Sequence, residues 1–233
     1  MSKLSIVATP IGTLEDITLR ALRTLKECDV IYAEDTRVIS KLLARYEISK
    51  PLQRLDAATE AKKAGEILER LEAGEHVVFV SDAGTPGISD PGARLVRAVR
   101  QSCEASREAG QQSVTIEAIP GASAITAALS IAGIDTTRFA FFGFPPHKKG
   151  RQTFVREVAE STIPVVLYES PHRILKLLSE LAIFAPACRV TIAREITKVH
   201  EEIVSGTPAE VALSLESRGA ARGEFVVIVE SSS

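Results

Sequence analysis

The chain has 233 residues, a formal net charge of −2 at pH 7 and 45% hydrophobic residues. These values are typical of a globular protein with one large or two modest domains, and they exclude nucleic-acid binding through a global basic field. The three cysteines, Cys28, Cys103 and Cys188, lie far apart, which argues against a disulfide framework or a zinc site. No apolar stretch reaches the roughly 18 residues of a membrane span, and the first apolar run is too short for a signal peptide, so we expect a soluble cytoplasmic protein.

Apolar runs of strand length alternate with helical patterns along most of the chain. The runs are residues 4–8, 30–33, 77–80, 114–119, 139–142, 165–168, 190–193 and 225–229. The helical patterns are residues 18–27, 60–73, 91–108, 122–132, 152–160, 171–184 and 208–217. This order predicts an α/β fold with mainly parallel sheets and helical cover. Together with the chain length, glycine- and proline-marked junctions predict an N-terminal α/β domain, residues 1–117, and a C-terminal α/β domain, residues 118–233.

Three segments carry the signal of a helix start, a capping side chain followed by proline. Ser-Pro at residues 170–171 and Thr-Pro at residues 207–208 each place a hydroxyl before the first helical position, so we predict helices that begin there. Ser-Asp-Pro at residues 89–91 has the same form. One interpretation of Ser89 and Asp90 is therefore that they cap the next helix.

The segment of residues 81–92, SDAGTPGISDPG, directly follows a predicted buried strand. Ligand sites of α/β proteins form at the carboxyl ends of strands. Glycines in such a loop allow the backbone to approach a ligand closely, and Asp82 and Asp90 can accept hydrogen bonds from ribose hydroxyls or an amino group. A helix cap would explain Asp90 but not residues 82–87. We therefore predict a binding loop.

Eight short motifs follow one another along the chain. They are residues 9–18 (TPIGTLEDIT), 33–37 (AEDTR), 81–92, 120–124 (PGASA), 142–146 (FGFPP), 168–173 (YESPHR), 193–198 (AREITK) and 223–225 (GEF). In this order they resemble the tetrapyrrole methylase superfamily and, within it, the ribosomal RNA small subunit methyltransferase I family. The resemblance covers nearly the whole chain. Thr13 and residues 55–60 depart from the pattern usual in that family.

The resemblance implies two α/β lobes of the tetrapyrrole methylase type, with S-adenosylmethionine (SAM) in a cleft between them, and a homodimer. It also implies a fold other than the Rossmann methyltransferase fold, in agreement with the lack of a G-x-G-x-x-G fingerprint. The implied activity is 2′-O-methylation of a cytidine ribose in the decoding region of 16S rRNA, within the small ribosomal subunit and without a membrane partner. Cofactor contacts carried over by motif are Ile11, Asp82, Thr85, Ser123, Ala124, Tyr168, Glu195, Gly223 and Glu224.

Methyl transfer from a sulfonium is an in-line displacement that requires positioning and no metal. Because a ribose hydroxyl is a poor nucleophile, we expect a carboxylate base. The candidates are Glu34, Asp35 and Glu169, with Glu195 as a further candidate. For Asp35 two interpretations stay open: a carboxylate with a direct catalytic role, or a helix cap paired with Arg37 on the surface.

Basic side chains at predicted loops and helix starts are candidate contacts to RNA phosphates. They are Arg37, Lys148, Lys149, Arg151, Arg173 and Lys198. The alternative for each is an ordinary solvated surface charge. Two other functions also remain open: methyl transfer to a tetrapyrrole or another small molecule, and a non-catalytic module that binds SAM or a nucleotide.

Overall fold

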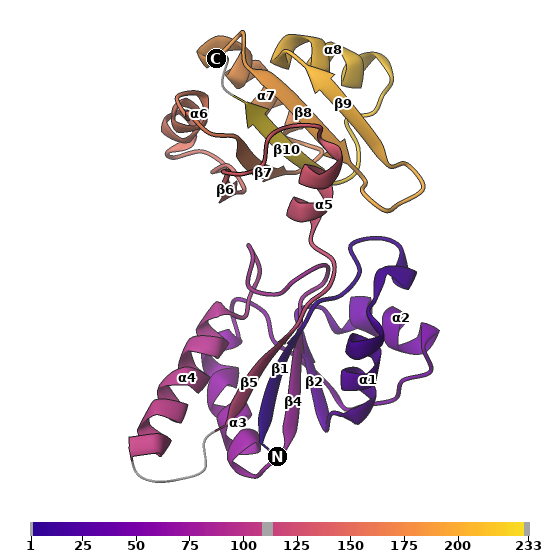
Figure 1. Ribbon diagram of the computed structural model, residues 1–233, viewed down its shortest axis with the longest axis vertical. Coiled ribbons are helices and arrows are strands. Elements are labelled where there is room, and N and C mark those ends of the chain that lie inside the picture. The colour runs from indigo at the N-terminus through magenta and orange to yellow at the C-terminus, as the bar shows by residue number, and fades with distance from the viewer. Residues whose placement is uncertain (1, 109–113, 231–233) are drawn as a thin grey trace. The chain divides into compact units, whose positions relative to one another are not determined.

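The computed structural model describes residues 2–108 and 114–230. Two compact units, Met1–Ser123 and Ala124–Ser233, each contain a five-stranded sheet (Figure 1). The sequence predicted a boundary after residue 117. Residues 118–123 instead stay with the first unit, because the Ala8 N–H donates to the Ile119 carbonyl at 3.1 Å and the Thr85 hydroxyl donates to the Ala122 carbonyl at 3.1 Å.

The first unit is a parallel sheet between two helical layers. Its strands are β1 (Lys3–Val7), β2 (Val30–Ala33), β3 (Leu52–Arg54), β4 (His76–Val80) and β5 (Thr115–Ile119), in the order β3-β2-β4-β1-β5. All neighbouring pairs are parallel, so every strand ends at the same edge. The helical elements are η1 (Leu14–Asp16), α1 (Leu19–Glu27), α2 (Thr36–Arg45), α3 (Glu60–Glu72) and α4 (Ala93–Glu108).

Both faces of this sheet are buried, which explains why its central strands are continuous apolar runs. Val78 and Val80 of β4 pack with α1 and α2 on one face, whereas Val77 and Phe79 pack with α3 and α4 on the other. The same division is visible in the ribbon (Figure 1). The alternation of side chains along a strand therefore supplies two separate cores.

The second unit has a mixed sheet in the order β6-β7-β10-β8-β9. The β6 and β7 strands are parallel, and the other neighbours are antiparallel. Three helices, α6, α7 and α8, pack against one face and share one core with Leu167, Ile192 and Val227. The elements are α5 (Ala124–Ile131), β6 (Ala140–Gly143), α6 (Arg151–Ala159), β7 (Val165–Glu169), α7 (Ile174–Phe184), β8 (Arg189–Arg194), β9 (Glu202–Gly206), α8 (Pro208–Ser217) and β10 (Phe225–Glu230).

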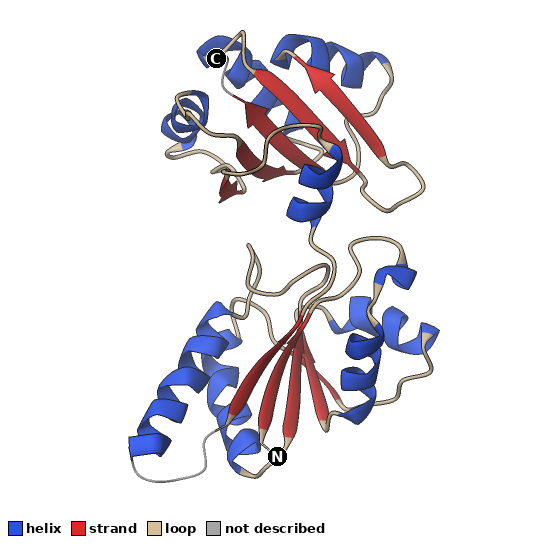
Figure 2. Cartoon of the chain, viewed as in Figure 1, coloured by secondary structure: helices blue, strands red, loops and turns tan. Residues whose placement is uncertain are grey.

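Four of the helices and strands coloured in Figure 2 were not predicted: η1, α2, β3 and β9. The β3 strand has only 3 residues, and β9 is an edge strand with partly exposed side chains, so neither gives a strong apolar run. The helix predicted from residue 171 begins at Ile174, after a turn. The prediction at residues 207–208 is confirmed, because Thr207 and Glu210 form a capping box around Pro208.

The three cysteines are buried free thiols. Each belongs to a different hydrophobic core. Burial raises the pKa of Cys28 and of Cys188 to about 11, which keeps both protonated and poorly reactive near neutral pH. Among the helices formed by residues 2–108 and 114–230, none combines the length and the apolar composition needed to cross a bilayer.

Candidate active site

Three motif loops meet at the carboxyl edge of the first sheet. Thr9, after β1, and Gly84, after β4, exchange two backbone hydrogen bonds of 2.9 and 3.0 Å. The Thr9 hydroxyl also donates to the Ser81 carbonyl at 3.3 Å. On the other side, the Thr85 hydroxyl donates to the Ala122 carbonyl, after β5, at 3.1 Å. These contacts join residues 9–11, 82–85 and 121–123 into one structure, which we call the backbone cradle.

Gly84 occupies a restricted point of the backbone cradle. Its φ is +78°, and a Cβ atom there would lie 3.3 Å from Ile11 Cγ2 and 3.5 Å from the Ala122 carbonyl oxygen. A side chain at this position would therefore be strained and crowded. The same contact places Ile11 against the segment of residues 82–85, which contains Asp82 and Thr85, so three of the cofactor contacts predicted from the motifs belong to the backbone cradle. Ser123 ends this unit and Ala124 begins α5.

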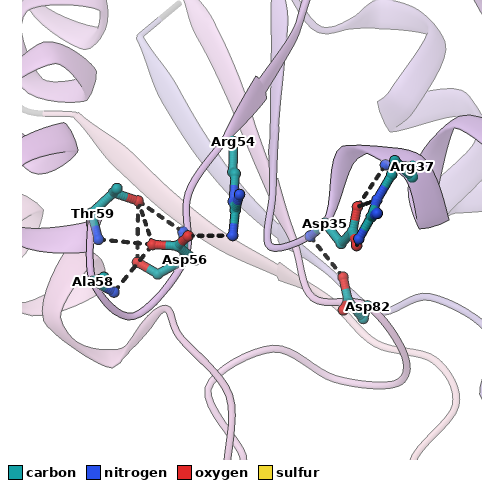
Figure 3. Close-up of polar contacts among 7 residues, drawn as sticks. All are labelled: Asp35, Arg37, Arg54, Asp56, Ala58, Thr59 and Asp82. Carbon is teal, nitrogen blue, oxygen red and sulfur yellow. Dashed lines mark hydrogen bonds and ion pairs between the residues drawn. The ribbon is translucent and has the colours of Figure 1, made fainter.

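Asp82 connects the backbone cradle with the acidic motif after β2. Its Oδ1 accepts a hydrogen bond from the backbone N–H of Asp35 at 2.8 Å (Figure 3). Asp35 in turn caps α2 by accepting from the Arg37 N–H at 2.9 Å, and its carboxylate pairs with the Arg37 guanidinium at 2.5 Å. These hydrogen bonds lower the pKa of Asp35 to about 2. The geometry is therefore that of the capping interpretation, with 87% of the Arg37 side chain exposed.

Glu34 and Asp90 form an acidic cluster with Asp82. Burial raises the pKa of Glu34, and the charges of Asp82 and Asp90 raise it further. Burial and the charge of Asp82 raise the pKa of Asp90 to about 6. Arg37 acts on this cluster through the charge of Asp82, whereas the neighbouring charge that acts on Asp90 is negative. The cluster is therefore a place where a cationic ligand gains electrostatic energy.

The helix after the binding loop is capped by a residue from another helix. Glu60, at the start of α3, is 4% exposed. Its Oε1 accepts from the backbone N–H groups of Gly92, Arg94 and Leu95 at 2.9 to 3.0 Å. The cap expected from Ser89 or Asp90 is therefore supplied by Glu60, and α4 begins at Ala93. This leaves the carboxylate of Asp90 in the acidic cluster instead of at the helix end.

Residues 55–60, which depart from the family pattern, form a local turn. Asp56 Oδ1 accepts from the Ala58 N–H at 3.1 Å and from the Thr59 N–H at 2.8 Å, and its other oxygen pairs with Arg54 at 2.8 Å (Figure 3). Such an Asx turn starts a helix efficiently. This turn places Glu60 where its side chain can cap α4.

In the second unit, three predicted site residues form a buried ion cluster. Glu169, at the end of β7, has a fully buried side chain and lies 3.5 Å from both Arg151 and Arg173. The side chains of Arg151 and Arg173 are only 4% and 15% exposed. By contrast, Lys148 and Lys149 are exposed. The two lysines thus have the accessibility that phosphate contacts need, whereas the arginines are engaged inside the protein.

Four further predicted residues of this unit form a second network. Glu195 Oε1 accepts from the Glu224 N–H at 2.8 Å and from Lys198 Nζ at 2.9 Å, and Lys198 also pairs with the Glu224 carboxylate at 2.8 Å. Gly223 has a φ of +94°, and a Cβ there would lie 2.5 Å from Glu195 Cγ. Glu195 itself has a φ of +49°. Strained backbone held by such contacts is typical of functional sites.

Tyr168, the remaining predicted cofactor contact, belongs to an aromatic group. Its ring centroid lies 5.0 Å from that of Phe141 and 5.4 Å from that of Phe144. Edge-on and tilted contacts at these distances are favourable. They fix the Tyr168 ring beside residues 142–146, the motif that contains Phe144.

Comparison with known proteins places this arrangement in a family. Residues 3–212 match the model of the Tetrapyrrole (Corrin/Porphyrin) Methylases. The chain belongs to this family. Proteins named ribosomal RNA small subunit methyltransferase I are similar over nearly its whole length: that of Thermotoga maritima is 40% identical over 98% of both chains, and that of Neisseria meningitidis is 44% identical over 97% of this chain and 75% of its own. The resemblance seen in the motifs is confirmed.

Two solved structures have the same fold as this chain. Diphthine synthase superposes with a TM-score of 0.73 at 17% identity, covering 99% of this chain and 90% of its own. The methyltransferase CobJ superposes with a TM-score of 0.68 at 22% identity, covering 100% and 95%. The predicted fold class is therefore confirmed: two α/β units, with a parallel first sheet and a mixed second sheet.

In this member of the tetrapyrrole methylases, sequence reasoning missed Glu60 and assigned Asp90 incompletely. Glu60 is the first residue of a predicted helix, but its partners are 32 to 35 residues away, so no local pattern points to them. For Asp90, the position in the binding loop indicated a carboxylate of the site, but the proline that follows it also favoured a helix cap. Among residues 2–108 and 114–230, no three His, Cys, Asp or Glu side chains are placed to hold a metal ion.

Proposed function

We propose that this chain transfers the methyl group of SAM to the 2′-hydroxyl of a cytidine ribose in the decoding region of 16S rRNA, in the small ribosomal subunit. The relatives named ribosomal RNA small subunit methyltransferase I support this assignment. One of them is 40% identical over 98% of both chains, and another is 42% identical over 99% of both chains. The structural observation that carries it is the hydrogen bond from the Asp35 N–H to Asp82, because it connects the backbone cradle to the loop that contains Glu34. We further propose that the protein works in the cytoplasm as a homodimer.

The acidic cluster next to the backbone cradle suits the charge of the donor molecule. SAM supplies a methyl group activated by a sulfonium, and it carries a second positive charge on its amino group and one negative carboxylate. The acidic cluster has three carboxyl groups, Glu34, Asp82 and Asp90, and Arg37, which pairs with Asp35, also acts on Asp82. Because the carboxyl groups outnumber this one guanidinium, a net cation is favoured there. Ile11, Thr85, Ser123 and Ala124 would hold the rest of the molecule.

Of the two adjacent acids after β2, Glu34 is better suited to take the proton from the ribose hydroxyl. A general base works best when its pKa approaches the working pH. The pKa of Glu34 is raised by burial and by its acidic neighbours. The pKa of Asp35 is lowered to about 2 by its bonds to Arg37, which makes Asp35 a weak base. We therefore assign proton removal to Glu34 and the positioning of α2 to Asp35.

Two groups of residues complete the proposal as predictions from the motifs. Tyr168, Glu195, Gly223 and Glu224 are proposed as further cofactor contacts, and their mutual contacts in the second unit are compatible with this role. Among the basic residues, the exposed Lys148, Lys149 and Arg37 are proposed as phosphate contacts. Lys198 remains a candidate in spite of its two acidic partners.

The test is transfer of labelled methyl from SAM to ribosomal subunits isolated from cells that lack this protein. The expected result is label in small-subunit RNA and none in large-subunit RNA, with the Glu34→Gln protein as the inactive control. Label in neither RNA, while SAM binds with measurable affinity, would reject the RNA assignment and favour a small-molecule acceptor or a sensor.

A further inference from the structure

Glu169 is the centre of a buried charge cluster that contacts the segment before α6. Its two carboxylate oxygens face Arg151 and Arg173, each at 3.5 Å. Arg151 also donates from Nε to Glu180 at 2.7 Å. Two carboxylates and two guanidinium groups therefore face one another, and Lys176 Nζ lies 4.0 Å from Glu180 Oε1 at the edge of the cluster. The cluster joins the end of β7 with the starts of α6 and α7.

Both arginines also bind the backbone of the segment before α6. Arg151 Nη1 donates to the Pro146 carbonyl at 3.2 Å, and Arg173 Nη2 donates to the same carbonyl at 2.9 Å. Arg173 Nη2 also donates to the Pro145 carbonyl. Because proline has a restricted φ, two consecutive prolines with anchored carbonyls give this segment a fixed direction.

The segment that follows these prolines, residues 147–150, is called the basic loop. Its side chains His147, Lys148 and Lys149 are exposed. The loop ends at Arg151, the first residue of α6, whose guanidinium is part of the charge cluster. The basic loop is therefore held at both ends by the same buried cluster, while its two lysines stay in solvent.

Stability alone is a poor explanation for such a cluster. Buried ion pairs often stabilise a protein no more than apolar residues of the same volume, because desolvation offsets the attraction. Here Nη2 of Arg151 is also buried without a hydrogen-bond partner in the described residues, which adds a further penalty. What the cluster supplies is one defined arrangement of the carbonyls of Pro145 and Pro146.

We propose that Glu169 is a positioning residue for RNA binding: through Arg151 and Arg173 it fixes the basic loop so that Lys148 and Lys149 contact phosphates of the substrate RNA. This inference rests on the proposed function, and it deepens that function by naming how the RNA contact is ordered. It gives Glu169 a role different from that of a catalytic base, and it gives the two arginines a role different from direct RNA contact.

The test is a cycle of variants measured with small ribosomal subunits as substrate. Glu169→Gln removes the charge that holds both arginines and keeps the size of the side chain. The double variant Lys148→Ala/Lys149→Ala removes the proposed phosphate contacts, and the triple variant combines all three changes. The readouts are KM and kcat for the subunits, the slope of log KM against log salt concentration, and the affinity for SAM.

Removing one lysine–phosphate interaction should reduce the salt slope by roughly 0.7 to 0.9, so the lysine double variant should show a reduction of up to about 1.8. We expect Glu169→Gln to raise KM about tenfold and to reduce the slope in the same direction, with kcat and SAM affinity unchanged. The triple variant should behave like the lysine double variant, because a mispositioned loop and a loop without lysines both fail to bind the phosphates. Additive effects on KM, or a fall in kcat at unchanged KM, would overturn the proposal.

Two controls separate this role from a general loss of structure. Leu215→Ala removes a buried side chain from the core of the same unit, so it should lower the melting temperature and leave the KM for subunits unchanged. Arg173→Lys keeps the charge but removes the guanidinium that binds two carbonyls, so it should have the effect that we expect of Glu169→Gln. It serves as the test variant if Glu169→Gln does not fold. If the lysine double variant has the parent KM, the proposed RNA contact itself fails. If it raises KM and neither Glu169→Gln nor Arg173→Lys does, only the positioning role fails.

Discussion

The Asp82 carboxylate accepts a hydrogen bond from the backbone N–H of Asp35 at 2.8 Å. This bond joins the loop after β4 to the loop after β2. One end belongs to the backbone cradle, and the other end is the residue that follows Glu34. The position of the proposed base is therefore coupled to the loop that is proposed to bind the methyl donor.

Replacing Asp82 should weaken SAM binding. Asp82→Ala removes a carboxylate from the acidic cluster and the acceptor for the Asp35 N–H. Charged hydrogen bonds contribute about 1.5 to 3 kcal/mol, so we expect the Kd for SAM to rise about 10- to 100-fold in isothermal titration calorimetry. Asp135→Ala is the matched control, since Asp135 accepts from Thr137 in an exposed turn of the second unit. Equal SAM affinity in both variants would contradict the assignment.

The two adjacent acids after β2 should respond differently to neutralisation. Glu34→Gln removes the proposed base, and we expect kcat to fall by about 10²- to 10⁴-fold while SAM affinity changes little. Asp35→Asn keeps a side chain that caps α2 well, and we expect kcat within about tenfold of the parent. Single-turnover transfer at saturating SAM measures both. The assignment is wrong if Asp35→Asn abolishes transfer and Glu34→Gln does not.

Asp90 should destabilise the folded protein at neutral pH. Its pKa is raised from 3.8 to about 6. Below pH 3.8 the carboxyl is protonated in the folded and unfolded states, so it has no effect there. As the pH rises to 6 the unfolded state ionises first and stability is lost. After a discount for its partial exposure, Asp90→Asn should raise the free energy of unfolding by about 1 to 2 kcal/mol at pH 7.5 and much less at pH 4.

Urea unfolding at the two pH values tests this prediction for Asp90. Asp135→Asn is the control with the opposite sign, because hydrogen bonds from Thr137 lower the pKa of Asp135. Its replacement should lower stability at pH 7.5. A gain from Asp90→Asn that is equal at both pH values would show that ionisation of Asp90 is not its cause.

The cap that Glu60 provides should contribute strongly to the stability of the first unit. Glu60→Ala leaves three backbone N–H groups at the start of α4, those of Gly92, Arg94 and Leu95, without this acceptor. We expect the free energy of unfolding to fall by about 2 to 4 kcal/mol. The exposed Glu69 on the same helix is the control, with an expected change from Glu69→Ala within about 0.5 kcal/mol. A small effect of Glu60→Ala would mean that another group or water caps α4.

The sequence predicted the parts of this protein that follow local patterns. Apolar runs predicted the central strands, and the turn residues of the binding loop predicted a site at the carboxyl edge of the first sheet. The cap from Glu60 could not be predicted, because it depends on the packing of α3 against α4. For the same reason Arg151 and Arg173 were predicted as accessible charges, whereas their partners Glu169 and Glu180 come from β7 and α7. Short or half-exposed edge strands such as β3 and β9 give no strong periodicity.

The central claim is tested most directly by locating the modified nucleotide. Small subunits from cells that lack this protein are methylated with SAM and purified enzyme, and their RNA is then partially hydrolysed with alkali and sequenced. We predict one new position resistant to cleavage, at a cytidine of the decoding region, which is missing after incubation with Glu34→Gln protein. Label on a base, or at several unrelated riboses, or on no RNA at all, would contradict the proposed activity.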